Sequence, residues 1–431
     1  MSTPLAPFYQ LKCGCNSYPW GKKGSSSLAA KLCAQTPGYA PDESAPMTPF
    51  KIDDDTPYAE MWMGTYPTLP SYVASTNEPL QAVIDRHASE LLGDAIINRF
   101  GHTDLPFLPK ILSISKALPL QIHPNKEFAA KMHQQKPNTF TDPNHKPEIA
   151  LALTPFEAFV GFKPLDAIAS LVNLPQLQHL HTTGRASRSA FTNEDLRTLV
   201  HTILSASPST LQSTYQALTS LPPSAFSPSP HNQHIHSLAP RLADQYPPSD
   251  PGLLVALLTM NYLTLQPGQA LYIPADGIHA YLSGDIVECM ARSDNVLNTG
   301  FCPAAQRDDA DTFCGLLTFA PHDPQACMLP HEKYWRSERG RTKVFAPPLG
   351  EFNVLETELG GGEEEVLLGE KEGGGGAGIV IATRGSGSVE AGGGGRGFEL
   401  GEGHVYFVGQ GVGMRIRAGE DGLVMHTAYV E

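Results

Sequence analysis

The sequence lacks an excess of basic residues and lacks long apolar runs. Its 30 Lys and Arg residues are outnumbered by 44 Asp and Glu residues, which gives a formal net charge of −14. This balance disfavours a nucleic-acid partner. No uninterrupted apolar stretch of about 18 residues is present, so we expect no transmembrane helix and no membrane partner. Residues 1–10 also lack the basic and apolar regions of a secretory signal.

Cysteine is also scarce. Seven cysteines in 431 residues are too few for a disulfide-stapled fold, and the number is odd. Cys13 and Cys15 lie close together, but no second pair follows at zinc-finger spacing. Reduced thiols in a cytoplasmic protein are therefore the simpler interpretation. The hydrophobic fraction of 41% is enough to bury a large core, so the composition predicts an acidic, multi-domain globular protein.

Glycine and proline are abundant, with 40 and 38 residues, which favours short strands joined by turns. Residues 8–164 alternate β-type runs with turns, and a helix of roughly ten residues is expected after Asn125. Residues 165–258 have a helical pattern, in which Thr192 and Asp195 form a capping-box signature. Strands are expected again at 262–265 and 270–273.

Two further segments carry weaker signals. Eight prolines between Leu221 and Pro251 predict a loop or variable insertion rather than a regular element. Beyond about residue 342, glycine runs that indicate flexible loops separate five short strand candidates, at 352–355, 378–382, 404–408, 414–416 and 423–429.

Two segments are rich in metal-ligand residue types. Gln121 and His123 alternate along a β-type run, so their side chains share a face if the segment is extended. His279 follows a turn and a hydrophobic strand, and Glu148 lies between the two segments. Two imidazoles, one carboxylate and one amide oxygen would suit zinc. Each histidine alone is more simply a hydrogen-bonded structural residue, and spacing alone does not unite the set, because Glu148 and His279 are about 130 residues apart.

Several blocks, in this order, resemble the type I phosphomannose isomerases. The blocks lie at residues 58–65 (YAEMWMGT), 116–126 (KALPLQIHPNK), 144–158 (NHKPEIALALTPFEA) and 279–291 (HAYLSGDIVECMA). Residues 11–13 and 20–22 also fit, and the resemblance extends from about residue 8 to residue 303. Long blocks with rare residues make this match more specific than any single short motif.

The resemblance implies a mainly β fold with an α insertion. It would consist of two cupin-like jelly-roll β domains, with a helical domain inserted in the first. The expected boundaries are 1–164 with 259–320 for the catalytic domain, 165–258 for the helical domain and 321–431 for the C-terminal domain. The resemblance also implies one Zn²⁺ per chain, with Gln121, His123, Glu148 and His279 as its ligands.

The family interconverts mannose 6-phosphate and fructose 6-phosphate through a cis-enediol, a step that serves GDP-mannose synthesis. We therefore expect a sugar-phosphate substrate and a monomeric enzyme. The reaction needs a base near two adjacent carbon atoms. Glu288 and Lys146 are the leading candidates, and Tyr281 and Asp294 are the others; the sequence does not choose among them.

The chain departs from the family at positions associated with binding the phosphate of the substrate. Asn298 stands where the family has a catalytic Arg, Ala304 where it has a Lys, and Pro119 where it has a Ser. A divergent isomerase could take its cation from elsewhere, and Arg292, Arg307 and Lys116 are the substrate-binding candidates. The alternatives are a paralogue that acts weakly or on another sugar, and a non-catalytic cupin that binds sugar.

Overall fold

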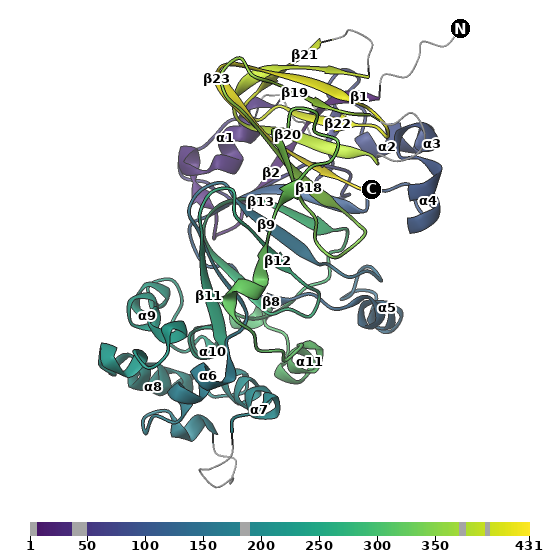
Figure 1. Cartoon of the computed structure of the whole chain (residues 1–431). Coiled ribbons are helices and arrows are strands. Elements are labelled where there is room, and N and C mark those ends of the chain that lie inside the picture. The colour runs from purple at the N-terminus through teal and green to yellow at the C-terminus, as the bar shows by residue number, and fades with distance from the viewer. Residues whose placement is uncertain (1–6, 37–49, 182–189, 370–375, 393–396) are drawn as a thin grey trace.

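Two large antiparallel sheets and a cluster of helices make up the structure, a computed structural model. It describes residues 7–36, 50–181, 190–369, 376–392 and 397–431. Figure 1 shows the strands of the C-terminal part at the top, a second group of strands in the middle and helices at the bottom. The expected mainly β fold with an α insertion is confirmed at this level. Two of the glycine runs, at 373–376 and 392–395, lie mostly outside the described residues.

The middle sheet holds most of the strands before residue 300. Its main path runs through β15 (Met328–Leu329), β12 (Ala270–Ile273), β9 (Glu148–Ala152), β13 (His279–Ala291), β7 (Phe107–Ile114), β5 (Glu60–Trp62) and β2 (Gly14–Asn16). Around β13 it branches to β8 (Leu120–Ile122), β10 (Phe156–Phe162), β11 (Met260–Leu265) and β14 (Leu297–Gly300). Every residue of β7 is buried, so both of its faces are covered.

The upper sheet gathers the C-terminal strands. Its path is β16 (Glu332–Lys333), β17 (Thr342–Phe345), β18 (Asn353–Leu359), β23 (Met414–Tyr429), β20 (Gly378–Ala391), β22 (Val405–Val408), β1 (Phe8–Lys12) and β6 (Tyr72–Val73). Two short strands, β19 (Glu364–Leu367) and β21 (Gly397–Gly401), pair with β23 and β20. The expected strands at 414–416 and 423–429 are thus two parts of one strand, β23.

The two N-terminal strands β1 and β6 differ from the expected domain division, which placed residues 1–164 in the catalytic domain. β1 pairs with β22 in the register Phe8↔Val408 and so extends the C-terminal sheet. Its backbone groups cover an edge that would otherwise be open. Chain order alone gives no sign of this pairing, because the partners are about 400 residues apart. A separate small ladder joins β3 (Lys22–Lys23) to β4 (Pro57–Tyr58).

Five helices form the lower cluster: α6 (Leu165–Val172), α7 (Asn193–Leu204), α8 (Pro208–Thr219), α9 (Ile235–Ala243) and α10 (Pro251–Thr259). All nine residues of α10 are buried, so this helix is the centre of the cluster. The capping box of Thr192 and Asp195 is confirmed at the start of α7. The loop expected for 221–251 is wrong in part, because α9 forms there and buries four apolar side chains, with Pro240 tolerated inside it.

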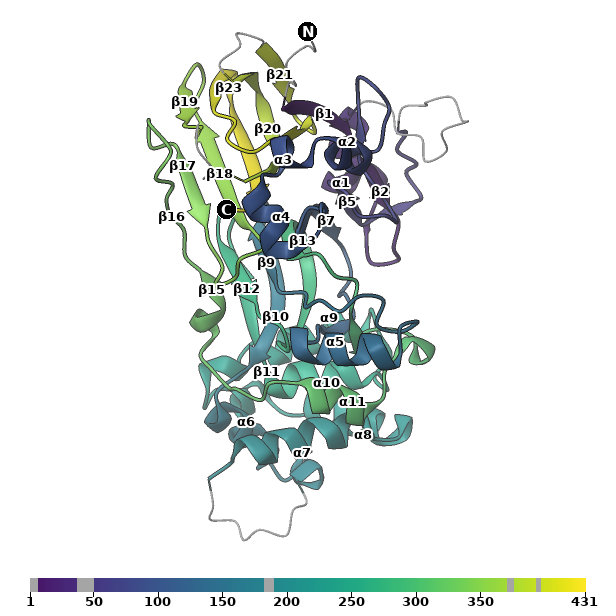
Figure 2. The same cartoon turned by 90° about the vertical axis from the view of Figure 1, so that its right-hand side faces the viewer.

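The remaining helices lie against the sheets. They are α1 (Leu28–Gln35), α2 (Leu80–Arg86), α3 (Ala88–Leu91), α4 (Asp94–Phe100), α5 (Lys126–Gln135) and α11 (Ala310–Leu316). Figure 2 shows α2, α3 and α4 beside the upper strands, and α5 and α11 near the lower cluster. The helix expected after Asn125 is confirmed as α5, and the Asn125 side chain caps it by accepting from the Phe128 N–H. Within the described ranges, no helix combines the length and the apolar character that crossing a membrane requires.

Asp250 joins the helical cluster to β14 and provides a stability test. Its side chain is almost fully buried, accepts hydrogen bonds from the Gly252 and Phe301 N–H groups and pairs with Arg307 at 2.7 Å. We expect Asp250→Ala to destabilise the fold by about 2–4 kcal/mol, because it strands two N–H donors and leaves the partly buried Arg307 guanidinium with the Cys302 carbonyl oxygen alone. The shift of the urea unfolding midpoint measures this effect.

Asp309→Ala is the matched control. Asp309 also caps a helix, α11, but it is exposed and its partners are confined to Thr312. Loss of an exposed cap costs about 1 kcal/mol. Equal midpoint shifts for the two variants would contradict the role assigned to the buried Asp250 contacts.

Candidate active site

Three buried ligand-type side chains converge at one end of the middle sheet. The ligand atoms of His123, Glu148 and His279 all lie within 4.8 Å of one another. Nε2 of His123 is 3.2 Å from Oε1 of Glu148, and Nε2 of His279 is 3.7 Å from Oε2. The described residues contain no other group of three His, Cys, Asp or Glu side chains with this geometry.

Strand pairing brings these residues together. Gln121 lies directly opposite His279 where β8 pairs with β13, and His123 follows β8. Glu148 opens β9 and pairs with Met290 of β13 on one side and Ile273 of β12 on the other. The long β13 therefore carries His279 and pairs both with β9, which carries Glu148, and with β8, which His123 follows. This explains how residues far apart in the sequence form one site.

The hydrogen bonds of both imidazoles fix which nitrogen is free. Nδ1 of His123 donates to the Asn295 carbonyl oxygen at 2.9 Å, and Nδ1 of His279 donates to the Gly277 carbonyl oxygen at 3.0 Å. Burial lowers the pKa of both rings, that of His279 to about 4, so both are neutral near pH 7. Each Nε2 therefore carries a lone pair, and neither has a hydrogen-bond partner.

These lone pairs point toward a carboxylate that is itself ionised. Burial alone would raise the pKa of Glu148, but the Lys146 ammonium, 3.3 Å from Oε1, holds it well below its usual range. Two neutral acceptors and a carboxylate in a dry site repel one another unless a cation lies between them. The donor set therefore fits a divalent metal ion, and Tyr281 holds the carboxylate by donating to Oε2 at 3.3 Å.

An adjoining cavity of about 410 Å³ gives access to Glu148. Its charged lining residues come from five separate segments and comprise four carboxylates and two ammonium groups: Glu60, Glu148, Glu288, Asp294, Lys110 and Lys146. Gln121, Pro119 and Asn298 also line it, together with the aromatic rings of Tyr18, Trp20 and Trp62. A sugar ring can lie against these aromatic walls while polar groups contact its hydroxyls.

A row of neighbouring residues crosses three strands beside this cavity. Trp62 of β5 lies opposite Lys110 of β7, which lies opposite Glu288 of β13. Nζ of Lys110 is 2.9 Å from Glu288 and 3.6 Å from Glu60, whose carboxylate accepts from the Trp62 indole at 2.6 Å. Burial opposes the charge of Lys110, yet the two carboxylates hold its pKa above the ordinary value.

Burial has the opposite effect on Glu288. Together with the nearby Glu148 and Glu60 it raises the pKa of Glu288 to about 7, although Lys110 opposes the rise. A carboxylate with such a pKa can both accept and release a proton near neutrality. Sequence reasoning found Glu288 but missed Lys110 and Glu60. A lone lysine within the apolar run of 107–114 is the signal that could have identified Lys110.

An irregularity in β13 places Glu288 beside the metal-ligand cluster. His279 and Glu288 are nine residues apart, so strict alternation would put them on opposite faces. The pairing with β10 shifts by one residue, from Ala158↔Tyr281 to Glu157↔Ser283, and Gly284 follows with a φ of 120°. A Cβ at Gly284 would lie 2.7 Å from the Pro155 carbonyl oxygen, so this bend requires glycine.

Of the remaining candidates, two line the cavity and two do not. Asp294 and Asn298 line it, and Oδ1 of Asn298 is buried without a partner. Tyr281 is fully buried behind Glu148. Ala304 is exposed, outside the cavity lining, and so contributes nothing to it.

The three expected substrate-binding cations are not in the cavity lining. Arg307 is held by Asp250 and the Cys302 carbonyl oxygen. Lys116 lies over the Tyr246 ring, 4.0 Å from its centroid. Arg292 lines a neighbouring cavity, where it pairs with Asp104 at 3.0 Å. Their roles in substrate binding stay predictions.

Comparisons with known proteins agree with one another. Residues 8–165 match the family model of the type I phosphomannose isomerase catalytic domain. The mannose-6-phosphate isomerase of Candida glabrata is 36% identical over 98% of this chain and 99% of its own length. The crystal structure of the apo form of mannose 6-phosphate isomerase from Salmonella typhimurium superposes with a TM-score of 0.77 at 25% identity, covering 99% of this chain and 100% of that chain. A mannose 6-phosphate isomerase structure bound with zinc and yttrium has the same fold, with a TM-score of 0.77 at 24% identity and the same coverage.

The ligand geometry predicts that the purified protein holds one divalent metal ion per chain, and that His279→Ala loses it. Removing one imidazole leaves an incomplete donor set, so we expect at least tenfold weaker binding. Elemental analysis after dialysis measures the metal content. His133→Ala, on α5 and outside the cluster, is the control and should keep the wild-type content. Equal stoichiometric metal in His279→Ala would remove His279 from the ligand set.

Proposed function

Because this chain belongs to the type I mannose-6-phosphate isomerase family, we propose that its cavity catalyses the aldose–ketose isomerisation of mannose 6-phosphate and fructose 6-phosphate. One observation carries the proposal beyond family membership. A buried carboxylate, Glu288, lines the same cavity as the metal-ligand residue Glu148 and is held by Lys110 at 2.9 Å. An isomerase that moves a proton between adjacent carbons needs both features.

We propose zinc as the metal, one per chain, held by Gln121, His123, Glu148 and His279. Neutral imidazole nitrogens with one carboxylate are a common donor set for zinc, and Gln121 lies beside His279 to add an amide oxygen. When bound, the ion supplies positive charge that stabilises the oxyanion character of the enediol. A neighbouring cation would also lower the pKa of Glu288 and keep its carboxylate ionised.

In the proposed mechanism, Glu288 accepts the proton from C2 of mannose 6-phosphate. The C2–H bonding electrons form the C1–C2 double bond while the C1=O π electrons move onto the C1 oxygen, which gives the cis-enediolate of the open-chain sugar, and a proton then moves from the C2 hydroxyl to the C1 oxygen. Glu288 then returns its proton to C1, which gives fructose 6-phosphate with no net gain or loss. Lys110 orients the carboxylate, and the Lys146 ammonium, 3.3 Å from Glu148, is placed to donate to the sugar oxygens.

Two features of the wider molecule belong to the same proposal. We propose that the two sheets are cupin-like jelly rolls, which the antiparallel pairing of all their strands supports. We also propose a cytoplasmic monomer. The cytoplasmic location is supported by the cysteines, because all seven are free thiols, as a reducing compartment requires. The monomeric state is supported by the scarcity of exposed apolar side chains: the described residues include four large ones, and two of these, Tyr18 and Val296, line the cavity itself.

Glu288→Gln tests the proton-transfer role. Glutamine keeps the shape of the side chain but cannot accept the proton, so we expect kcat to fall by about 10²–10⁴-fold. A coupled assay with zinc-saturated protein measures turnover, and elemental analysis checks that the metal stays bound. Glu332→Gln, exposed on β16, is the control. Unchanged turnover in Glu288→Gln would move the base to Lys146.

A second candidate function arises from the charge of the cavity. Its lining carries four carboxylates and two ammonium groups, and both ammonium groups already pair with carboxylates. A phosphate dianion is normally held by Arg, Lys or other strong donors. Asn298 and Pro119, at the positions where the family has Arg and Ser, supply no cation. The second candidate is therefore a diverged paralogue that isomerises an uncharged hexose, or mannose 6-phosphate only at high concentration.

Asn298→Arg separates the two candidates. A new cation in the cavity should lower KM for mannose 6-phosphate by about tenfold or more, at roughly 1.5–3 kcal/mol per charged hydrogen bond, without improving turnover of free mannose. Asn298→Gln, which lengthens the side chain without adding charge, is the control. Wild-type protein that saturates at micromolar mannose 6-phosphate, with no gain from Asn298→Arg, would refute the lost-cation account.

A further inference from the structure

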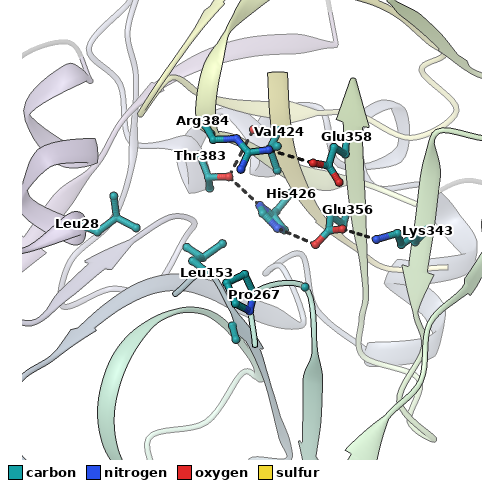
Figure 3. Close-up of a pocket in the computed structure, with 12 residues that line it drawn as sticks. Leu28, Leu153, Pro267, Lys343, Glu356, Glu358, Thr383, Arg384, Val424 and His426 are labelled. Carbon is teal, nitrogen blue, oxygen red and sulfur yellow. Dashed lines mark hydrogen bonds and ion pairs between the residues drawn. The ribbon is translucent and has the colours of Figure 1, made fainter. Parts of the chain in front are cut away.

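A second cavity of about 270 Å³ lies at the junction of the upper and middle sheets, and it shares no lining residue with the cavity beside Glu148. One wall comes from the C-terminal strands β17, β18, β20 and β23. The facing wall is apolar and is formed by Leu28, Ala152, Leu153 and Pro267. Figure 3 shows the polar side chains of the first wall opposite Leu153 and Pro267.

The polar wall is a cross-strand row. Lys343 lies opposite Glu356 where β17 pairs with β18, and Glu356 lies opposite His426 where β18 pairs with β23. Nζ of Lys343 is 2.9 Å from Oε1 of Glu356, and Nδ1 of His426 is 3.1 Å from the Thr383 hydroxyl. Such a row of polar residues inside a domain junction needs a partner for each atom.

One atom in this row has none. Only 2% of His426 is exposed, and its Nε2 lacks a hydrogen-bond partner. The Thr383 hydroxyl lies 3.4 Å from the Val424 carbonyl oxygen, so it can donate there while it accepts from Nδ1–H of His426 at 3.1 Å. In the neutral ring, Nε2 is then an acceptor, and it lies 3.6 Å from the acceptor Oε2 of Glu356. Donor groups in the cavity beside these two atoms would satisfy both.

The surrounding charges limit what that donor group can be. A metal ion would have just two protein ligands and would lie near the Lys343 ammonium, which disfavours it. An anion would find both cations committed, because Lys343 pairs with Glu356 and Arg384 pairs with Glu358 at 3.0 Å. A purely apolar molecule would leave Nε2 and Oε2 without donors.

We propose that this junction cavity is a binding site for a neutral polyhydroxylated molecule of monosaccharide size. One hydroxyl donates to Nε2 of His426, and a neighbouring hydroxyl donates to Oε2 of Glu356. The C–H face of the ligand packs against Leu153 and Pro267. Because the ligand contacts both sheets, it holds the two parts of the enzyme together. This site does not depend on the activity proposed for the metal cavity.

Methyl NMR of the full-length protein with added mannitol tests the proposal. Mannitol has no carbonyl group and so cannot be isomerised. We expect saturable shifts of the Leu153 and Val424 methyl signals, which report on the junction cavity. The methyl groups of Leu118 and Val296 line the metal-site cavity and report separately on binding there. Shifts confined to Leu118 and Val296 would overturn the proposal.

Two variants and one control complete the experiment. His426→Phe removes the acceptor at similar volume and should weaken mannitol binding at the junction at least tenfold. Glu356→Gln removes the charge of the second acceptor and should weaken it too, and it supplies the test if His426→Phe does not fold. His404→Phe, on the same domain but outside the cavity, should bind as the wild type does. An unchanged dissociation constant in both junction variants, or no shift up to the solubility limit of mannitol, would overturn the proposal.

Discussion

The candidate active site depends on a carboxylate that is buried between two neutral imidazoles. Glu148 is 1% exposed and His123 and His279 are fully buried, so water cannot relieve the repulsion among their lone pairs. The backbone settles the tautomers, because carbonyl oxygens of Asn295 and Gly277 hold both Nδ1–H groups. Folding therefore brings three acceptor groups to one point at a cost in free energy. Such an arrangement is stable when a cation occupies that point, which couples metal binding to the folding of β8, β9 and β13.

Three candidate ligand residues could be predicted from the sequence, but the geometry that brings them near Glu288 could not. The resemblance supplied His123, Glu148 and His279, which the structure brings within 4.8 Å of one another, whereas the role of Gln121 as a ligand stays a prediction. Strict alternation would put Glu288 and His279 on opposite faces of β13, and the register shift at Ser283 that changes this depends on pairing with β10. A bulge leaves almost no local signal beyond one glycine, Gly284, in a chain that contains 40.

Helices and strands were predicted correctly where a local signal marks them. The predictions failed where contacts with residues distant in the sequence determine the structure. The Asn125 cap and the Thr192 capping box identified α5 and α7. The proline-rich segment 221–251 indicated a loop, yet Ile235, Leu238 and Leu242 bury one face of α9 against the helical cluster. Tertiary burial there outweighs the cost of Pro240. β1 likewise joined the C-terminal sheet through backbone pairing, which side chains do not encode.

Charge balance is the constraint that links the site to its substrate. Every ammonium group beside Glu148 is matched by a carboxylate: Lys110 by Glu288 and Glu60, and Lys146 by Glu148. A divalent ion would bring the total charge of the cavity lining close to zero, because the lining carries two more carboxylates than ammonium groups. A neutral sugar fits this balance without rearrangement, whereas a phosphate dianion adds two uncompensated charges. This balance leaves the proposed metal-ligand and proton-transfer residues unaltered, so on this proposal the part of the cavity that would meet the phosphate decides which hexose is accepted.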